Sequence, residues 1–185
     1  MMIGWWIAVL ILTIGAIGAA MIAARTEKYW LATVSLVPVA IALILGSTGN
    51  TLPGNASGLI VLMSAALVAL ATIAGSPLVA LVLSLASYPA PRGEHGGILV
   101  ADGDSPLPKR EVLRGGTTIG YLERFAFIGS LMVGQPGAIA VMVAIKGLGR
   151  FSELENAAAR ERFIIGTLVS MVWAGLCTAA LLVGR

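Results

Sequence analysis

Charged residues are scarce in this chain of 185 residues, and their scarcity excludes an ordinary soluble domain. Only 11% of the residues are Asp, Glu, Lys or Arg, whereas a typical soluble domain has about one quarter. Apolar residues make up 58%, and the mean hydropathy is +0.95. The basic residues behind the net charge of +3 flank apolar segments and do not cluster with aromatic residues, so a nucleic-acid partner is not expected.

Cysteine and histidine are almost absent, with Cys177 and His95 the single examples of each. An internal disulfide is therefore impossible, and no His/Cys metal-binding spacing exists. Cys177 is interpreted as a small packing residue within an apolar run. Asp102 and Asp104 form a loose D-x-D pair, but no second acidic cluster completes a metal site, so turn-forming aspartates are favoured. We expect no metal and no cofactor.

Long apolar runs dominate the rest of the chain and predict an all-α integral membrane bundle of six transmembrane helices in a single domain. The predicted spans cover about residues 4–24, 29–46, 58–74, 117–133, 138–149 and 163–183. Residues 88–116 form the only long polar segment and are predicted to be a cytoplasmic strap. Within this strap, the sequence GGILVADGDSP favours either a small hairpin or an extended conformation.

Proline and glycine interrupt two of the apolar runs. Pro38 lies within the second predicted span and is expected to kink it. Gly75-Ser76-Pro77 has the pattern of a helix stop followed by an N-cap and a first-turn proline. Leu78 to Ser87 is therefore predicted to be a separate short helix that does not span the membrane. It is either interfacial or a bent continuation of the third span.

The positions of Lys and Arg predict the orientation. Three connections carry basic residues, at 25–28, 88–116 and 150–162, whereas the loops between spans two and three and between spans four and five carry none. Because cytoplasmic loops are enriched in Lys and Arg, we expect both termini outside the cell and the basic loops in the cytoplasm. The predicted location is the bacterial inner (plasma) membrane.

Five charged residues lie within or beside the last three spans. They are Glu123, Arg124, Lys146, Arg150 and Glu161. Charges near hydrocarbon are costly, so each needs a partner, a wet cavity or the interface. Lys146 and Arg150 are four residues apart and share a helix face, whereas Glu123 and Arg124 point about 100° apart. Glu161 enters at the first turn of the last span, where the helix dipole favours a carboxylate.

The cluster admits three interpretations that the residues alone leave open. It is an ion-pair network that holds the last three helices together, or a site with one surplus positive charge suited to phosphate or carboxylate groups. An anionic lipid headgroup is the nearest such ligand. In the third interpretation Glu123 carries a proton or a cation.

Three segments of this region, GGTTIGYLERF, AIKGLGRF and ERFIIGTLVS, resemble a bacterial multi-spanning membrane family that is classed as a domain of unknown function. The resemblance covers about residues 115–170. It departs from the family pattern at A-I-K for A-A-K, at Gly147 where serine is usual, and at Arg162 where an aromatic residue is usual. The resemblance implies that the five charged residues act as one unit, and it implies no activity.

The leading functional hypothesis is a non-enzymatic membrane component, either a small transporter or the membrane subunit of a larger assembly. Its expected partners are the lipid bilayer with its anionic headgroups, and further copies of the chain or other subunits of a complex. The alternative is a membrane-embedded enzyme that acts on a lipid or isoprenoid phosphate, with Asp102, Asp104 or Glu123 as the acid. No lipase, metalloprotease or nucleotide-binding motif supports that alternative.

Overall fold

The computed structural model describes residues 2–86, 98–100, 110–112, 116–149, 151 and 157–184. Within these ranges the chain is almost entirely helical, which confirms the all-α class. The helices are α1 Met2–Thr26, the 3-10 helix η1 Tyr29–Ser35, α2 Leu36–Ser47, α3 Ser57–Ala86, α4 Gly116–Met132, α5 Gly137–Leu148 and α6 Ala157–Val183. Two short strands, β1 Ile98–Val100 and β2 Arg110–Val112, pair antiparallel with Ile98 opposite Val112. β1 lies within GGILVADGDSP, but its partner strand β2 lies after that segment, so the paired strands are farther apart in the chain than a hairpin within GGILVADGDSP would place them.

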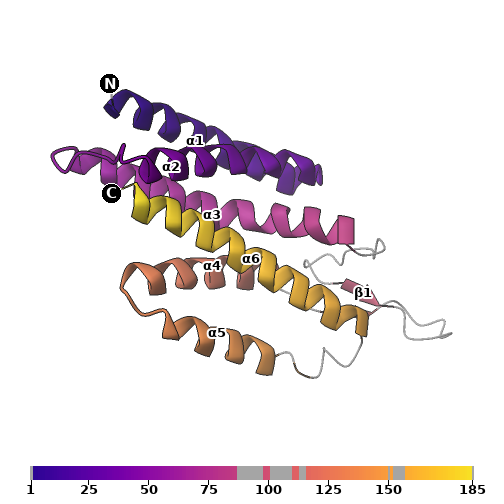
Figure 1. Cartoon of the computed structure of the whole chain (residues 1–185). Coiled ribbons are helices and arrows are strands. Elements are labelled where there is room, and N and C mark those ends of the chain that lie inside the picture. The colour runs from indigo at the N-terminus through magenta and orange to yellow at the C-terminus, as the bar shows by residue number, and fades with distance from the viewer. Residues whose placement is uncertain are drawn as a thin grey trace.

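The helices lie side by side in up-and-down order (Figure 1). Both ends of the chain, the α2–α3 loop and the α4–α5 turn lie at one end of the bundle. The α1–η1 turn, the end of α3 and the start of α6 lie at the other end. This alternation agrees with the pattern of the basic loops. Which end faces the cytoplasm stays a prediction.

Four helical segments of the described chain are long and apolar enough to cross a membrane. They are Ile3–Thr26, Tyr29–Ser47, Ser57–Ala86 and Ala159–Val183. By contrast, α4 has 17 residues and α5 has 12. At the helical rise they extend only about 26 Å and 18 Å, which is shorter than a hydrocarbon core of about 30 Å. The count of six transmembrane spans therefore stays a prediction, whereas a bundle built on four long apolar helices is shown.

The predicted helix stop at Gly75-Ser76-Pro77 is wrong, because α3 continues through it as one helix of 30 residues. The described residues of the expected interfacial segment, 78–86, are the last turns of α3. Of the two interpretations given for this segment, continuation of the third span is the one that the structure supports.

A side chain from another helix contacts α3 beside its internal proline. Pro77 has no N–H, so the carbonyl of Ile73 loses its usual donor and the helix is weakened at this turn. Arg124 of α4 supplies new hydrogen bonds there, from Nε to the Thr72 carbonyl at 2.9 Å and from Nη2 to the Ser76 hydroxyl at 2.7 Å. Neighbouring helices commonly satisfy the backbone beside a membrane-buried proline in this way.

The core lies where α3 packs against α1 and α6. Ala16 and Ala20 of α1 are fully buried, so this small-residue face forms a helix contact inside the chain. Trp6 is only 1% exposed, and its indole N–H donates to the Asn50 carbonyl at 2.8 Å. Trp5 remains exposed.

The second span begins as η1 and becomes α-helical at Leu36. Pro38 is therefore the third residue of α2. The proline thus marks the start of α2, and the change in helix type occurs just before it.

Candidate functional site

An ion pair joins α5 to α4. Lys146 Nζ lies 2.5 Å from Glu123 Oε2, and the two side chains are 18% and 16% exposed. The Lys146 ammonium also lies 5.4 Å from the centroid of the Phe163 ring on α6, within the range of a cation–π contact. Lys146 therefore stands between α4 and α6 near the end of α5.

Arg124 follows Glu123 in the chain, yet its side chain turns toward α3 and is only 3% exposed. Its guanidinium donates to the Thr72 carbonyl, to the Ser76 hydroxyl and, from Nη1 at 3.0 Å, to the Ser170 hydroxyl on α6. One arginine thus connects three helices. All three acceptors are neutral, so the hydrogen bonds satisfy donors without cancelling the charge.

Glycine makes room for this arginine. A Cβ atom on Gly75 of α3 would lie 2.5 Å from both Cδ and Nε of Arg124, a distance that real Cβ contacts do not reach. Gly120, one turn earlier on α4, is also close, because a Cβ there would lie 3.1 Å from Nη1. The Tyr121 ring completes the surroundings, with its centroid 5.4 Å from the guanidinium carbon.

The turn between α4 and α5 folds α5 back along α4. Gly134 has a φ of +71°, and its N–H donates to the Leu131 carbonyl while the Gln135 N–H donates to the Ser130 carbonyl. This is the Schellman arrangement, in which glycine occupies the left-handed position that ends a helix. Pro136 then precedes α5. The sequence GQPG therefore sets the hairpin that brings Lys146 to Glu123.

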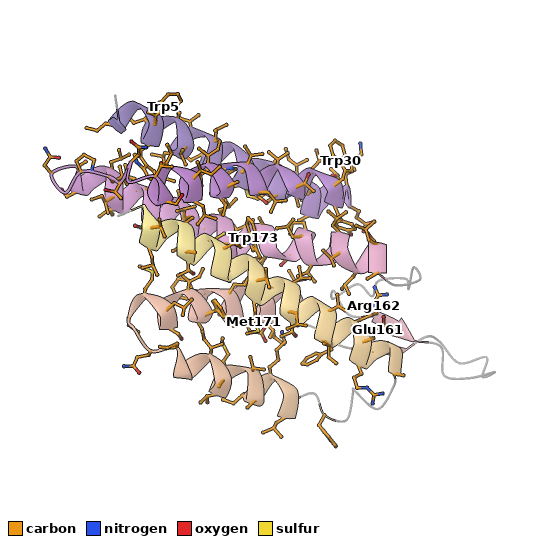
Figure 2. The ribbon with its side chains drawn as sticks, in the orientation of Figure 1. Trp5, Trp30, Glu161, Arg162, Met171 and Trp173 are labelled. Atoms are coloured by element: carbon orange, nitrogen blue, oxygen red, sulfur yellow. The ribbon has the colours of Figure 1, made fainter. Side chains whose placement is uncertain are left out.

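A shallow cavity that is open on one side lies between α4, α5 and α6; the empty space in and in front of it amounts to about 310 Å³. Its polar lining residues are Glu123, Arg124, Lys146, Thr167 and Ser170. The Thr167 hydroxyl oxygen is buried and has no hydrogen-bond partner within the described part of the chain. Figure 2 shows Met171, another lining residue, on the side of α6 that faces the α4–α5 hairpin.

The five charged residues predicted to act together do not all meet in the described structure. Glu123, Arg124 and Lys146 line one cavity. Glu161 is exposed near the start of α6, away from Met171 (Figure 2), and it does not line the cavity. Arg150 lies outside the described residues.

The acidic pair and the histidine considered in the sequence, Asp102, Asp104 and His95, also lie outside the described residues. Within the ranges that the structure describes, no group of three or more His, Cys, Asp or Glu side chains could hold a metal ion. Cys177 is buried among apolar neighbours, in the packing position expected for it.

The polar groups of α3 that hold Arg124 were not expected from the sequence, because Ser76 was interpreted as an N-cap. The available signal is Gly75 directly before Ser76: a residue without a side chain next to a hydroxyl group lets another helix bring a polar side chain close.

The cavity combines two positive charges, on Arg124 and Lys146, with one negative charge on Glu123. One surplus positive charge remains, beside the free hydroxyl of Thr167. A phosphate or carboxylate group has the charge and the acceptor oxygens that such a site would bind.

No protein-family profile, curated protein or solved structure matches this chain. The resemblance of residues 115–170 to a bacterial membrane family accordingly stays a prediction. The apolar composition and the four long apolar helices are those of a membrane protein.

Proposed function

We propose that the chain is a non-enzymatic membrane component, a small transporter or the membrane subunit of a larger assembly, whose α4–α5–α6 cavity binds an anionic group. The headgroup of an anionic lipid is the nearest ligand with this chemistry. One observation carries the proposal: Arg124 is buried in the cavity wall with only neutral hydrogen-bond acceptors among the described residues.

The charge of Arg124 favours an anion because its described hydrogen-bond acceptors are all neutral. A buried charge needs both hydrogen bonds and an opposite charge to offset its lost hydration. Glu123 is adjacent in sequence, but its carboxylate is paired with Lys146 at 2.5 Å. An anion in the cavity would supply the missing charge and would accept from guanidinium N–H groups.

The position of the site also favours a ligand from the inner leaflet. Lys146 is two residues from the end of α5, and α1 and α3 end and α6 begins at that end of the bundle, next to the stretches of sequence rich in Lys and Arg. Such stretches are typical of the cytoplasmic side, where anionic lipids give the membrane surface a negative potential. We therefore assign the site to the cytoplasmic leaflet.

The test compares thermal unfolding in phosphatidylcholine nanodiscs with and without phosphatidylglycerol. Anionic lipid at about 100 times its dissociation constant stabilises a protein by about 2.7 kcal/mol, which for a chain of this size raises the unfolding midpoint by about 5 °C or more. Lys146→Gln is expected to lose most of that increase because one of the two cations lining the cavity is removed.

Lys28→Gln is the matched control, because Lys28 is an exposed lysine on the same end of the bundle and far from the cavity lining. It should keep the wild-type response to phosphatidylglycerol. Equal protection of wild type, Lys28→Gln and Lys146→Gln would show that the lipid acts through general surface charge, and the proposed site would be wrong.

A further inference from the structure

The lining of the cavity is divided into a polar half and an apolar half. The apolar lining residues are Phe127, Met142, Val143, Met171 and Ala174. On α4 and α6 the apolar residues come after the polar ones in the chain, whereas on α5 they come before Lys146. Each helix therefore changes from polar to apolar within about one turn.

The direction of the three helices puts all polar groups at the same end. In Figure 1, α4 and α6 run in the same direction and α5 runs back between them in the chain. Because α5 runs in the opposite direction, its polar residue Lys146 lies at the same end of the cavity as the polar residues of α4 and α6. The charged end lies toward the start of α6, and the apolar end lies deeper in the bundle.

From this division we infer that the occupant is an amphiphile with one anionic head and a hydrocarbon tail, an inference that rests on the proposed anion-binding function. The head lies among Arg124, Thr167 and Lys146, and the first part of the tail lies along Phe127, Met142 and Met171. Phosphate and carboxylate heads share the required chemistry.

Unused hydrogen-bonding groups define the place of the head. Each terminal nitrogen of a guanidinium carries two N–H groups, and Nη1 and Nη2 of Arg124 each have one protein partner within the described residues. The buried Thr167 hydroxyl has no such partner. Two guanidinium N–H groups and one hydroxyl thus lack a partner within the described residues, and the oxygens of a single carboxylate or phosphate have the chemistry to serve as their acceptors.

The apolar half explains why a bare inorganic anion is a poorer match. A small anion is too short to touch Phe127 and the two methionines, whereas an alkyl chain that lies against them gains dispersion contacts. Methionine side chains are flexible and polarizable, so they adapt to an alkyl chain. A tail would supply these contacts.

The position of α5 gives the tail a route from the bilayer. None of the residues of α5 is fully buried, and the helix packs chiefly on α4. Its described link to α6 is the Lys146 ammonium beside the Phe163 ring. An amphiphile can therefore pass sideways between α5 and α6 without disturbing the core around α3.

The test measures thermal stabilisation in phosphatidylcholine nanodiscs by three probes: tetradecanoate, acetate and tetradecanol. Tetradecanoate and tetradecanol are compared at equal mole fraction in the disc, and acetate is added to the buffer. Tetradecanoate should stabilise the wild type most, because it alone has both the anionic head and the tail.

Two variants address the two halves of the cavity separately. Lys146→Gln should weaken tetradecanoate binding about tenfold, the effect of losing one charge-assisted contact, and should leave the response to tetradecanol unchanged. Met142→Gln should also weaken tetradecanoate binding about tenfold, because an amide would be buried without a partner. Lys28→Gln and Met21→Gln are the matched controls outside the cavity and should behave like the wild type.

The outcomes separate this inference from the proposed function. If acetate stabilises the wild type as strongly as tetradecanoate does, and Lys146→Gln removes both effects, the anion site stands and the amphiphile is wrong. If tetradecanol equals tetradecanoate and Lys146→Gln changes neither, the cavity does not recognise charge, and both the amphiphile and the anion-binding function are overturned.

Discussion

Replacing Gly75 by alanine is the sharpest test of how α3, α4 and α6 are held together. The change adds one methyl group in the middle of a helix, where alanine is ordinarily favoured over glycine by about 1 kcal/mol. At this position, however, the new Cβ would lie 2.5 Å from two side-chain atoms of Arg124. The arginine must move, because α3 continues as a helix on both sides of Gly75.

The expected loss follows from the hydrogen bonds that Arg124 would give up. It makes three described hydrogen bonds, to Thr72, Ser76 and Ser170, and a bond from a charged donor contributes about 1.5 kcal/mol at the lower end of the usual range. Three such bonds amount to about 4.5 kcal/mol, from which alanine's helix preference of about 1 kcal/mol is subtracted. We expect Gly75→Ala to lower the free energy of unfolding by about 3 to 4 kcal/mol.

The assay is unfolding in mixed micelles with a rising fraction of dodecyl sulfate, followed by far-ultraviolet circular dichroism. Gly129→Ala on α4 is the matched control, since a Cβ there meets no atom within 4 Å. That control should be neutral or more stable by up to about 1 kcal/mol. A double variant with Arg124→Ala removes the side chain that the new methyl group would strike.

In the Arg124→Ala background, Gly75→Ala should therefore cost nothing, and the coupling between the two positions should be about 3 kcal/mol, the upper end for residues in contact. The expectation is refuted if Gly75→Ala and Gly129→Ala unfold at the same fraction of dodecyl sulfate. It is also refuted if the loss persists undiminished after Arg124 has been removed.

Two further predictions concern α5 and the path of the chain. A double-mutant cycle of Glu123→Gln and Lys146→Met in the same unfolding assay should give a coupling energy of about 1 to 2 kcal/mol, because the paired side chains are mostly buried. Losses of stability that are strictly additive would contradict the ion pair. Single cysteines at the exposed positions Lys28 and Gln135 should react with a membrane-impermeant maleimide from opposite sides of the membrane. The native Cys177, 1% exposed, should stay unlabelled until the protein is denatured. Labelling of both new cysteines from one side would disprove the up-and-down path through α4.

The extents of the shorter helices were predictable because they depend on local sequence. The predicted spans 117–133 and 138–149 differ by one residue at each end from α4 and α5. The GQPG turn between them combines glycine and proline at positions where both end or begin helices on steric grounds. The helical class and the membrane character follow from the same local property, since long uncharged apolar runs satisfy their backbone groups as helices.

The continuity of α3 was not predictable from its own residues. Gly75-Ser76-Pro77 has every local feature of a helix boundary, and the donor to Thr72 and Ser76 beside it is Arg124, 47 positions after Pro77 in the chain. The close approach at Gly75 likewise exists only after α4 packs on α3. A local pattern cannot reveal hydrogen bonds that a distant helix supplies.

By itself, the sequence determined that this chain folds as apolar helices, that its basic residues lie in alternate connections, and that a few charges must be accommodated near the last three helices. Only the tertiary structure decided which of those charges meet. It paired Lys146 with Glu123 across the α4–α5 hairpin and buried Arg124 against α3, while it left Glu161 exposed near the start of α6. The reason is physical: hydropathy and helix propensity act between neighbours in the chain, whereas a charge in an apolar bundle is stabilised by whichever polar groups packing brings within hydrogen-bonding distance.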